Sequence, residues 1–189
     1  PFEPPPLALR FRFSLDGVPI VLEREVVYRY RDQAYGEVRR PLRVVPKLEV
    51  AAGRSLIVWP ISSRGEERLA VEIRSNVDRP VAARLEVAVP EGWPAVPPRE
   101  VSLPAAGRAE VEVVLRPPAD FAPGRYAIEL AAVDEAGVRP PGERFDREIR
   151  LVDYEHVRPT PLPAAARVEV SAGHIRLPAL RRLGFVRGG

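Results

Sequence analysis

Apolar and polar residues alternate with a period of two along most of the chain, the pattern of half-buried β-strands. The first alternating segment is residues 7–15, where leucine or phenylalanine occupies every odd position. Asp16-Gly17 comes next and is typical of a tight hairpin turn. Residues 18–32 predict a second strand, whose apolar face Arg24 interrupts, and residues 39–51 predict a proline-broken strand suited to a sheet edge.

Residues 1–45 thus hold about three strands, whereas an immunoglobulin-like sandwich needs about seven. We expect a partial β-sheet module, the C-terminal part of a first immunoglobulin-like domain. Either the rest of this module precedes Pro1, or these strands pack against the later strands of the chain. The chain opens with PFEPPPL, which is neither a start with Met nor a signal peptide, so we expect a fragment of a longer protein.

From residue 46 the alternation becomes regular, with turn signals about every 10 to 15 residues. Seven or eight short strands predict an all-β fold, an immunoglobulin-like antiparallel β-sandwich over residues 46–154. Residues 155–189 are predicted to be a linker and the first strand of a truncated α/β domain, with a turn or two of helix in 177–184. The residues expected to point into the core are Leu69, Val71, Ile73, Leu85, Val87, Val89, Val111, Val113, Leu115, Tyr126, Ile128 and Leu130.

A tryptophan interrupts one predicted turn, in the segment VPEGWPAVPP at residues 89–98. We expect the strand before it to cross to the opposite sheet, which leaves one end of the sandwich open. Trp93 then folds back and closes that end, and the neighbouring prolines fix the backbone. The other interpretation makes Trp93 an exposed platform for a sugar ring, a glycan contact. The pattern favours structural roles for Trp93 and Tyr126.

The composition narrows the classes of function. The chain has no cysteine, which excludes disulfide bonds and thiolate metal sites. Its net charge is only +3, and arginine and glutamate alternate along it, so we expect solvated strand faces and no nucleic-acid partner. Lys47 is the only lysine, which suggests an arginine-rich proteome such as that of a thermophile. No apolar run reaches the ~18 residues of a membrane span.

No catalytic residue and no metal ligand emerges from the pattern. His156 and His174 are the only histidines, and their spacing matches no zinc motif. A Gly-x-Ser-x-Gly elbow is absent, and nearly all carboxylates fall on the outward phase of the strands. The sequence therefore predicts no enzyme activity and no cofactor for the residues present.

Three segments together resemble a region of large bacterial proteins. They are residues 26–46, the Trp93 turn with the strands after it, and the stretch from LVDYEHVRP to LGFVRGG at 151–189. They are similar to the region downstream of the catalytic domain in PIG-L/LmbE-type deacetylases, where immunoglobulin-like modules come after an N-acetylglucosaminyl-type deacetylase domain. Glu155 stands where that family's connector has proline. The Trp93 turn also resembles the immunoglobulin-like domain that accompanies some bacterial α-galactosidases.

The resemblance implies a non-catalytic accessory region that spaces or docks the catalytic domain of the same chain. It implies zinc only in that domain, upstream of Pro1, because the HPDD-type zinc motif has no match here. It also implies a secreted or cell-envelope location. The alternative is an independent carbohydrate-binding or cell-surface module. Aromatic residues make up only 7% of the chain and mostly fall on inward phases, which favours the accessory role.

Overall fold

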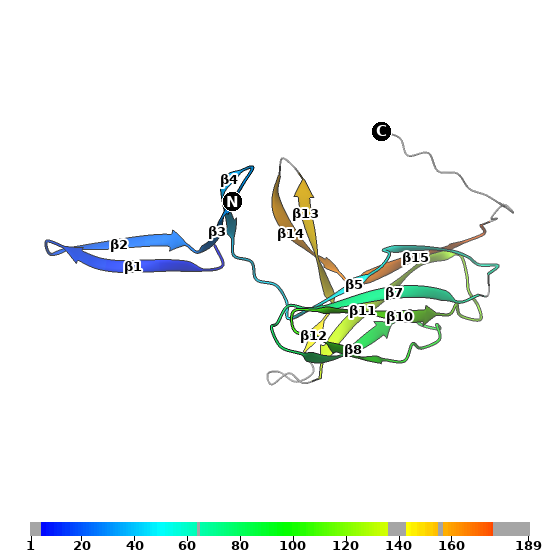
Figure 1. Cartoon of the computed structure of the whole chain (residues 1–189). Coiled ribbons are helices and arrows are strands. Elements are labelled where there is room, and N and C mark those ends of the chain that lie inside the picture. Colours follow the sequence, from blue (N-terminus) through cyan, green and yellow to red (C-terminus); the bar gives the residue numbers. More distant parts are fainter. Residues whose placement is uncertain (1–4, 64, 136–142, 155–156, 176–189) are drawn as a thin grey trace. The chain divides into compact units, whose positions relative to one another are not determined.

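The computed structural model describes residues 5–63, 65–135, 143–154 and 157–175, and these residues form strands and connections only (Figure 1). The prediction of an all-β fold built on an antiparallel sandwich is confirmed. The chain divides into two compact units, residues 1–45 and 46–189. Among the described residues no helix is long and apolar enough to cross a membrane.

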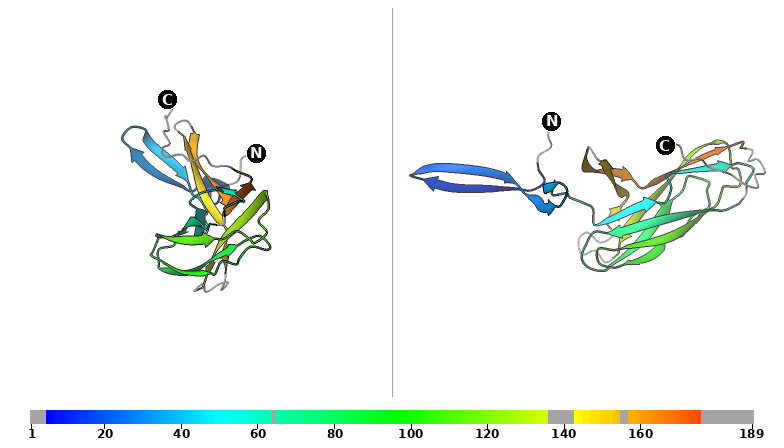
Figure 2. Two further views of the ribbon diagram at one scale, coloured as in Figure 1. Left: turned by 90° about the vertical axis from the view of Figure 1, so that its right-hand side faces the viewer. Right: turned by 45° about the horizontal axis from the view of Figure 1, so that its top comes forward.

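The first unit consists of two hairpins. Strands β1 (Ala8–Leu15) and β2 (Val18–Glu25) pair through the Asp16-Gly17 turn, where both residues have positive φ, 50° and 82°. Two consecutive positive φ angles are the geometry of the two-residue turn whose twist matches that of the strands. Strands β3 (Val27–Asp32) and β4 (Gly36–Pro41) form the second hairpin. Figure 2 shows the β1–β2 hairpin in blue as a two-stranded ribbon.

The sequence pattern predicted too few strands in this region. Residues 18–32 are two strands that pair with different partners, and Val26 between them belongs to neither strand, although its N–H donates to the carbonyl of Leu7. Residues 39–51 are likewise divided between β4 and the first strand of the second unit. Each of these stretches of alternating residue types therefore extends across a break in strand pairing.

The second unit is a sandwich of two sheets. One sheet has the order β10-β7-β5, and the other has the order β6-β15-β11-β8-β9, with β12 beside β11. All pairs in these sheets are antiparallel except β6 with β15. A further hairpin, β13–β14, pairs only with itself. The bounds are β5 Leu48–Ala52, β6 Leu56–Pro60, β7 Glu67–Ser75, β8 Val81–Ala88, β9 Arg99–Leu103, β10 Arg108–Leu115, β11 Gly124–Asp134, β12 Arg144–Phe145, β13 Arg147–Tyr154, β14 Val157–Ala165 and β15 Arg167–Gly173.

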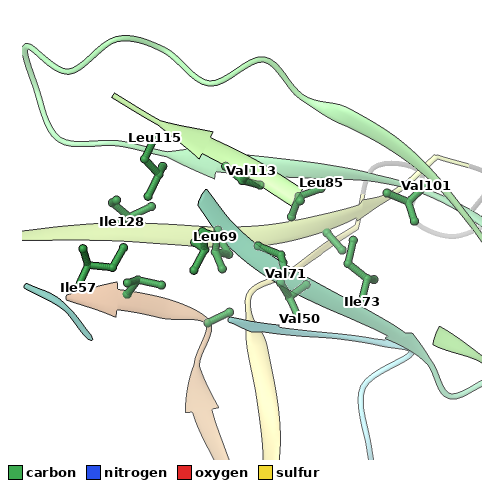
Figure 3. Packing of buried hydrophobic residues seen from close by; sticks show 14 of the residues in the cluster. Val50, Ile57, Leu69, Val71, Ile73, Leu85, Val101, Val113, Leu115 and Ile128 are labelled. Atoms are coloured by element: carbon green, nitrogen blue, oxygen red, sulfur yellow. The ribbon is translucent and has the colours of Figure 1, made fainter. Parts of the chain in front are cut away.

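The core between the two sheets is formed by alternate residues of these strands (Figure 3). Removing these apolar side chains from water is the main term that holds such a sandwich together. The inward phase predicted from the sequence is correct at each position named: Leu69, Val71, Ile73, Leu85, Val113, Leu115, Ile128 and Leu130 are buried, and Val87, Val89, Val111 and Tyr126 are partly buried against the core.

The predicted domain boundary at residue 154 is wrong. Strand β15 lies between β6 and β11 within the second sheet, and Val168 and Val170 are fully buried there. Residues 167–173 therefore belong to the sandwich and not to a linker. Residues 144–154, which the alternation predicts as the last strand of the sandwich, contribute only β12 to the sheet and continue into the β13–β14 hairpin. The predicted helix at 177–184 and the expected start of a further domain lie outside the described residues.

The predicted crossing at residues 89–98 is also wrong. Strands β8 and β9 are neighbours in one sheet, with Val81 opposite Leu103 and Leu85 opposite Arg99. The Trp93 segment is thus a long hairpin connection, and the change of sheet occurs in the short connection between β9 and β10. A proline-rich connection can join two paired strands as readily as two sheets, and the alternation within each strand is the same in both cases.

Candidate functional site

The Trp93 connection is built on a tight turn over residues 90–93. The N–H of Trp93 donates to the carbonyl of Pro90 at 3.1 Å, and Gly92 has a φ of 81°. A positive φ at the third residue of such a turn is strained for residues with a side chain, so glycine is suited to this position. The turn reverses the chain directly before Trp93 and directs its ring back toward the sandwich.

Four aromatic rings meet at this end of the core. The centroid of the Trp93 ring lies 5.8 Å from that of Trp59, 5.5 Å from that of Phe121 and 5.4 Å from that of Tyr126. The contacts with Trp59 and Phe121 are edge-to-face, with interplanar angles of 80° and 85°. Edge-to-face packing places the positive edge of one ring against the negative face of another. The cluster joins β6, the start of β11 and the two connections that hold Trp93 and Phe121.

Trp93 is therefore a core residue of this fold. Only 7% of it is exposed, so neither face of its ring is open to stack on a sugar. Its Nε1 is buried and makes no hydrogen bond within the described part of the chain. Tyr126 is partly buried beside it, and its hydroxyl donates to the carbonyl of Ala122 at 2.9 Å. That bond ties the start of β11 to the connection before it.

A small hollow lies beside this connection and has a volume of about 220 Å³. Small-molecule pockets usually measure ~300–1,000 Å³, so the hollow is too small to enclose an oligosaccharide. Glu66 pairs with one of its two arginines, Arg116, at 2.7 Å. The lining residues are Pro94, Ala95, Val96, Pro97, Arg99, Val113, Val114 and Arg116.

Apart from the aromatic cluster, a buried ion pair also connects the two sheets. Lys47, directly before β5, donates from Nζ to Oδ2 of Asp134, the last residue of β11. The side chains are 19% and 2% exposed, and Oδ1 of Asp134 makes no hydrogen bond within the described residues. Removing one member of such a pair leaves the other charge buried without a partner, which lowers the unfolding free energy by about 3–5 kcal/mol. The only lysine of the chain thus has a structural position that composition could not reveal.

Several other charged residues form exposed pairs on the outer strand faces. Examples are Arg68 with Glu112 at 2.8 Å and Arg108 with Glu72 at 3.4 Å, both between β7 and β10. Exposed pairs contribute about 0–1 kcal/mol each. No group of three or more His, Cys, Asp or Glu side chains that could hold a metal ion occurs among the described residues. His174 is exposed, whereas His156 lies outside the described residues.

The β3–β4 hairpin carries an aromatic and basic surface that the sequence analysis did not single out. The ring of Tyr28 lies 5.6 Å from that of Tyr30, and the Arg40 guanidinium lies 5.3 Å over the Tyr30 ring. Tyr28 is 61% exposed. The hydrogen bond from Arg39 lowers the pKa of Glu37 below its usual value, with the charge of Arg29 acting in the same direction. The signal in the sequence was the alternation YRYR, which places both tyrosines on one strand face.

The comparison with protein families matches residues 65–133 to the NPCBM-associated, NEW3 domain of alpha-galactosidase. The matched stretch contains β7 to β10 and nearly all of β11, including the Trp93 connection, and leaves the first unit and strands β5, β6 and β12–β15 outside. A comparison with curated proteins finds no match.

Solved structures with a similar arrangement include several unrelated proteins. One is WR4, a C. elegans MSP family member, at 14% identity and a TM-score of 0.33, covering 66% of this chain and 97% of that one. Another is PapD-like domain 7 of human CEP192, at 12% identity and 0.37, covering 78% and 99%. A third is a family 123 glycoside hydrolase from Clostridium perfringens, at 9% and 0.35, covering 67% and 27%. Likenesses this weak carry no argument about function.

The family match therefore supports one of the two resemblances stated from the sequence. Strands β7–β11 and the Trp93 connection are similar to an accessory domain found in α-galactosidases.

Proposed function

We propose that this chain is a non-catalytic accessory β-sandwich region of a larger carbohydrate-active bacterial enzyme. The observation that carries the proposal is the match of residues 65–133 to a domain of α-galactosidase, placed on a sandwich whose large aromatic cluster is buried. An accessory domain that supports a neighbour needs a stable core and solvated outer faces. The paired Arg and Glu residues on the β7–β10 face fit that requirement.

The finer part of the proposal concerns the parent protein. We assign it to the zinc-dependent N-deacetylases of the PIG-L type, on the resemblance of residues 26–46 and 151–189, with the sandwich spacing or docking the catalytic domain. Zinc then belongs to the catalytic domain and not to this chain. The corresponding location is secreted or in the cell envelope. A nucleic-acid partner is not part of this proposal, because arginines and carboxylates alternate on the strand faces.

The test compares the parent enzyme with and without residues 46–175. We expect the shortened enzyme to melt at a lower temperature while kcat on a small N-acetyl sugar changes little, since the sandwich supplies no reacting group. The 189-residue chain alone should contain no stoichiometric zinc by metal analysis and should hydrolyse no N-acetyl sugar. Zinc that disappears when His156 or His174 is replaced, or hydrolysis by the chain alone, would contradict the proposal.

The second candidate is carbohydrate binding, favoured by the exposed Tyr28 beside Tyr30 and Arg40. Exposed, adjacent aromatic rings are the side chains on which sugar rings stack. A titration of the 189-residue chain with bacterial-envelope and plant oligosaccharides distinguishes the accessory function from the carbohydrate-binding function. Binding that Tyr28→Ala abolishes and Tyr154→Ala leaves intact would support the binding module. Tyr154 is the matched control, because it is 69% exposed but lies on β13.

A further inference from the structure

The β1–β2 hairpin separates apolar and polar side chains onto opposite faces. Residues opposite each other in the register share a face, so Phe11 lies beside Leu22 and Phe13 beside Ile20. The other face is polar, with Arg10 bonded to Glu23 at 3.3 Å. The apolar face, which is named here the ribbon face, consists of Leu7, Leu9, Phe11, Phe13, Leu15, Val18, Ile20 and Leu22.

The ribbon face is uncovered. Phe11 is 50% exposed, Phe13 46% and Leu15 62%, although these residue types are normally buried. The hairpin is also a two-stranded sheet, and a lone two-stranded hairpin is at best marginally stable in water. Such a hairpin becomes stable when its apolar face packs on another apolar surface. The ribbon face is therefore the feature of the first unit that most calls for a covering surface.

The size of the ribbon face suits a second copy of the same chain. With about half of each large side chain uncovered, it presents roughly 600 Å² of apolar surface, more than the few hundred Å² that monomeric proteins usually leave in one patch. Two such faces packed together would bury about 1,200 Å², the lower bound of specific protein interfaces. Two flat sheet faces also stack readily at the ~10 Å spacing of paired sheets.

The charges at the two ends of the ribbon specify one arrangement. Arg24, opposite Leu9, is the single charged residue in line with the ribbon face, at the end away from the turn. Asp16 is in the turn at the other end, directly after Leu15. A two-fold axis through the middle of an antiparallel pair of ribbons brings Arg24 of each copy beside Asp16 of the other. A parallel arrangement would instead place the two arginines together, which is unfavourable.

We propose that the ribbon face is the interface of a homodimer, in which two β1–β2 hairpins pack antiparallel about a two-fold axis. The axis passes between Phe11 and Phe13, so Phe11 of each copy lies near Phe13 of the other. The interface consists of residues of the first unit only, and it is independent of the proposed accessory function. Two-stranded ribbons that are marginal alone become a four-stranded, two-layered core in the dimer.

Sedimentation equilibrium of the full 189-residue chain over a hundredfold range of concentration tests the dimer. We expect a monomer–dimer equilibrium, which Phe13→Glu weakens at least a hundredfold because it places two carboxylates near the axis. Ser14→Glu adds the same charge on the opposite face and should leave the equilibrium unchanged. Both tryptophans lie in the sandwich, so an unchanged tryptophan emission spectrum shows that the variants retain its fold. A wild-type chain that stays monomeric throughout would overturn the proposal, as would equal weakening by both variants.

Cysteine cross-linking tests the orientation, since the natural chain has no cysteine to interfere. The antiparallel arrangement brings Leu9 of one copy near Leu15 of the other. A mixture of the Leu9→Cys and Leu15→Cys chains should therefore form disulfide-linked dimers at least ten times faster than either chain alone. Faster linking within each separate variant would overturn the antiparallel arrangement. Co-sedimentation of the monomer with neutral phosphatidylcholine vesicles, without a dimer, would assign the ribbon face to a lipid surface and overturn the proposal.

Discussion

Trp93 contacts three other aromatic rings, so its effect on stability depends on a cluster and not on one contact. The sequence pattern correctly predicted that Trp93 packs against the core. The prolines around it fix the backbone of the connection, which suits a buried structural side chain. It could not identify the neighbours, since Trp59 and Phe121 come from connections or strands far away in the chain. It also could not distinguish the paired Lys47 from a solvated lysine.

The Trp93→Ala variant should lose about 3–5 kcal/mol of unfolding free energy, the range for deleting a large buried aromatic side chain. The cavity should remain open, because the prolines around residue 93 limit how far the connection can collapse. Thermal or denaturant unfolding of both proteins, with and without oligosaccharide, measures the difference. Tyr154→Ala is the control at an exposed ring and should change stability by less than about 0.5 kcal/mol. An unchanged melting temperature for Trp93→Ala would exclude the core role.

At the scale of the elements, strand β15 shows what alternation can and cannot predict. Its sequence, RVEVSAG, alternates as clearly as that of β7, yet the predicted sandwich ended before it, at residue 154. Period-two alternation identifies a half-buried strand but not its neighbours, because every strand of a sandwich alternates in the same way. The parallel pairing of β15 with β6 joins segments about 110 residues apart, which no local signal specifies.

A chain ending at residue 154 should therefore fail to form a stable sandwich. Loss of β15 removes the backbone partner of β6 and one of the partners of β11, and it uncovers the core on that side. We expect loss of the cooperative unfolding transition and aggregation through the open strand edges. In the full chain, Val170→Asp should also abolish the transition, whereas Glu169→Gln, which is on the outward side, should preserve it. A soluble, cooperatively folding 1–154 chain would restore the boundary predicted from the sequence.

At the scale of the whole molecule, the two units differ in how they are stabilised. All residues of the buried core cluster lie between Leu48 and Ala172, within the second unit. The first unit has two hairpins and a largely uncovered apolar face. The division near residue 45 could be predicted from the prolines there and from the regular alternation that begins at residue 46. The exposure of the first unit's apolar residues could not be predicted, because alternation shows that a strand face is apolar but not whether another surface covers it.

Residues 46–189 alone should retain the fold of the sandwich. Their melting temperature should lie within about 4 °C of the full chain's sandwich transition, which corresponds to roughly 1–2 kcal/mol for a domain of this size. Differential scanning calorimetry of the two chains, with tryptophan emission as the probe of the aromatic cluster, measures this. Residues 1–45 alone serve as the comparison and should show no cooperative transition at low concentration. A large drop in the melting temperature of 46–189 would show that the first unit stabilises the sandwich.

The place of β15 also determines when the protein can fold during its synthesis. The ribosome delivers the chain from the N-terminus at about 5–20 residues per second. Strands β5–β11 emerge while the position between β6 and β11 is still empty, so the second sheet stays divided until residue 173 has left the exit tunnel. During that interval the nascent chain exposes unpaired strand edges, which can pair with other chains. A sandwich closed by the last of its described strands is thus completed only after residue 173 has been translated.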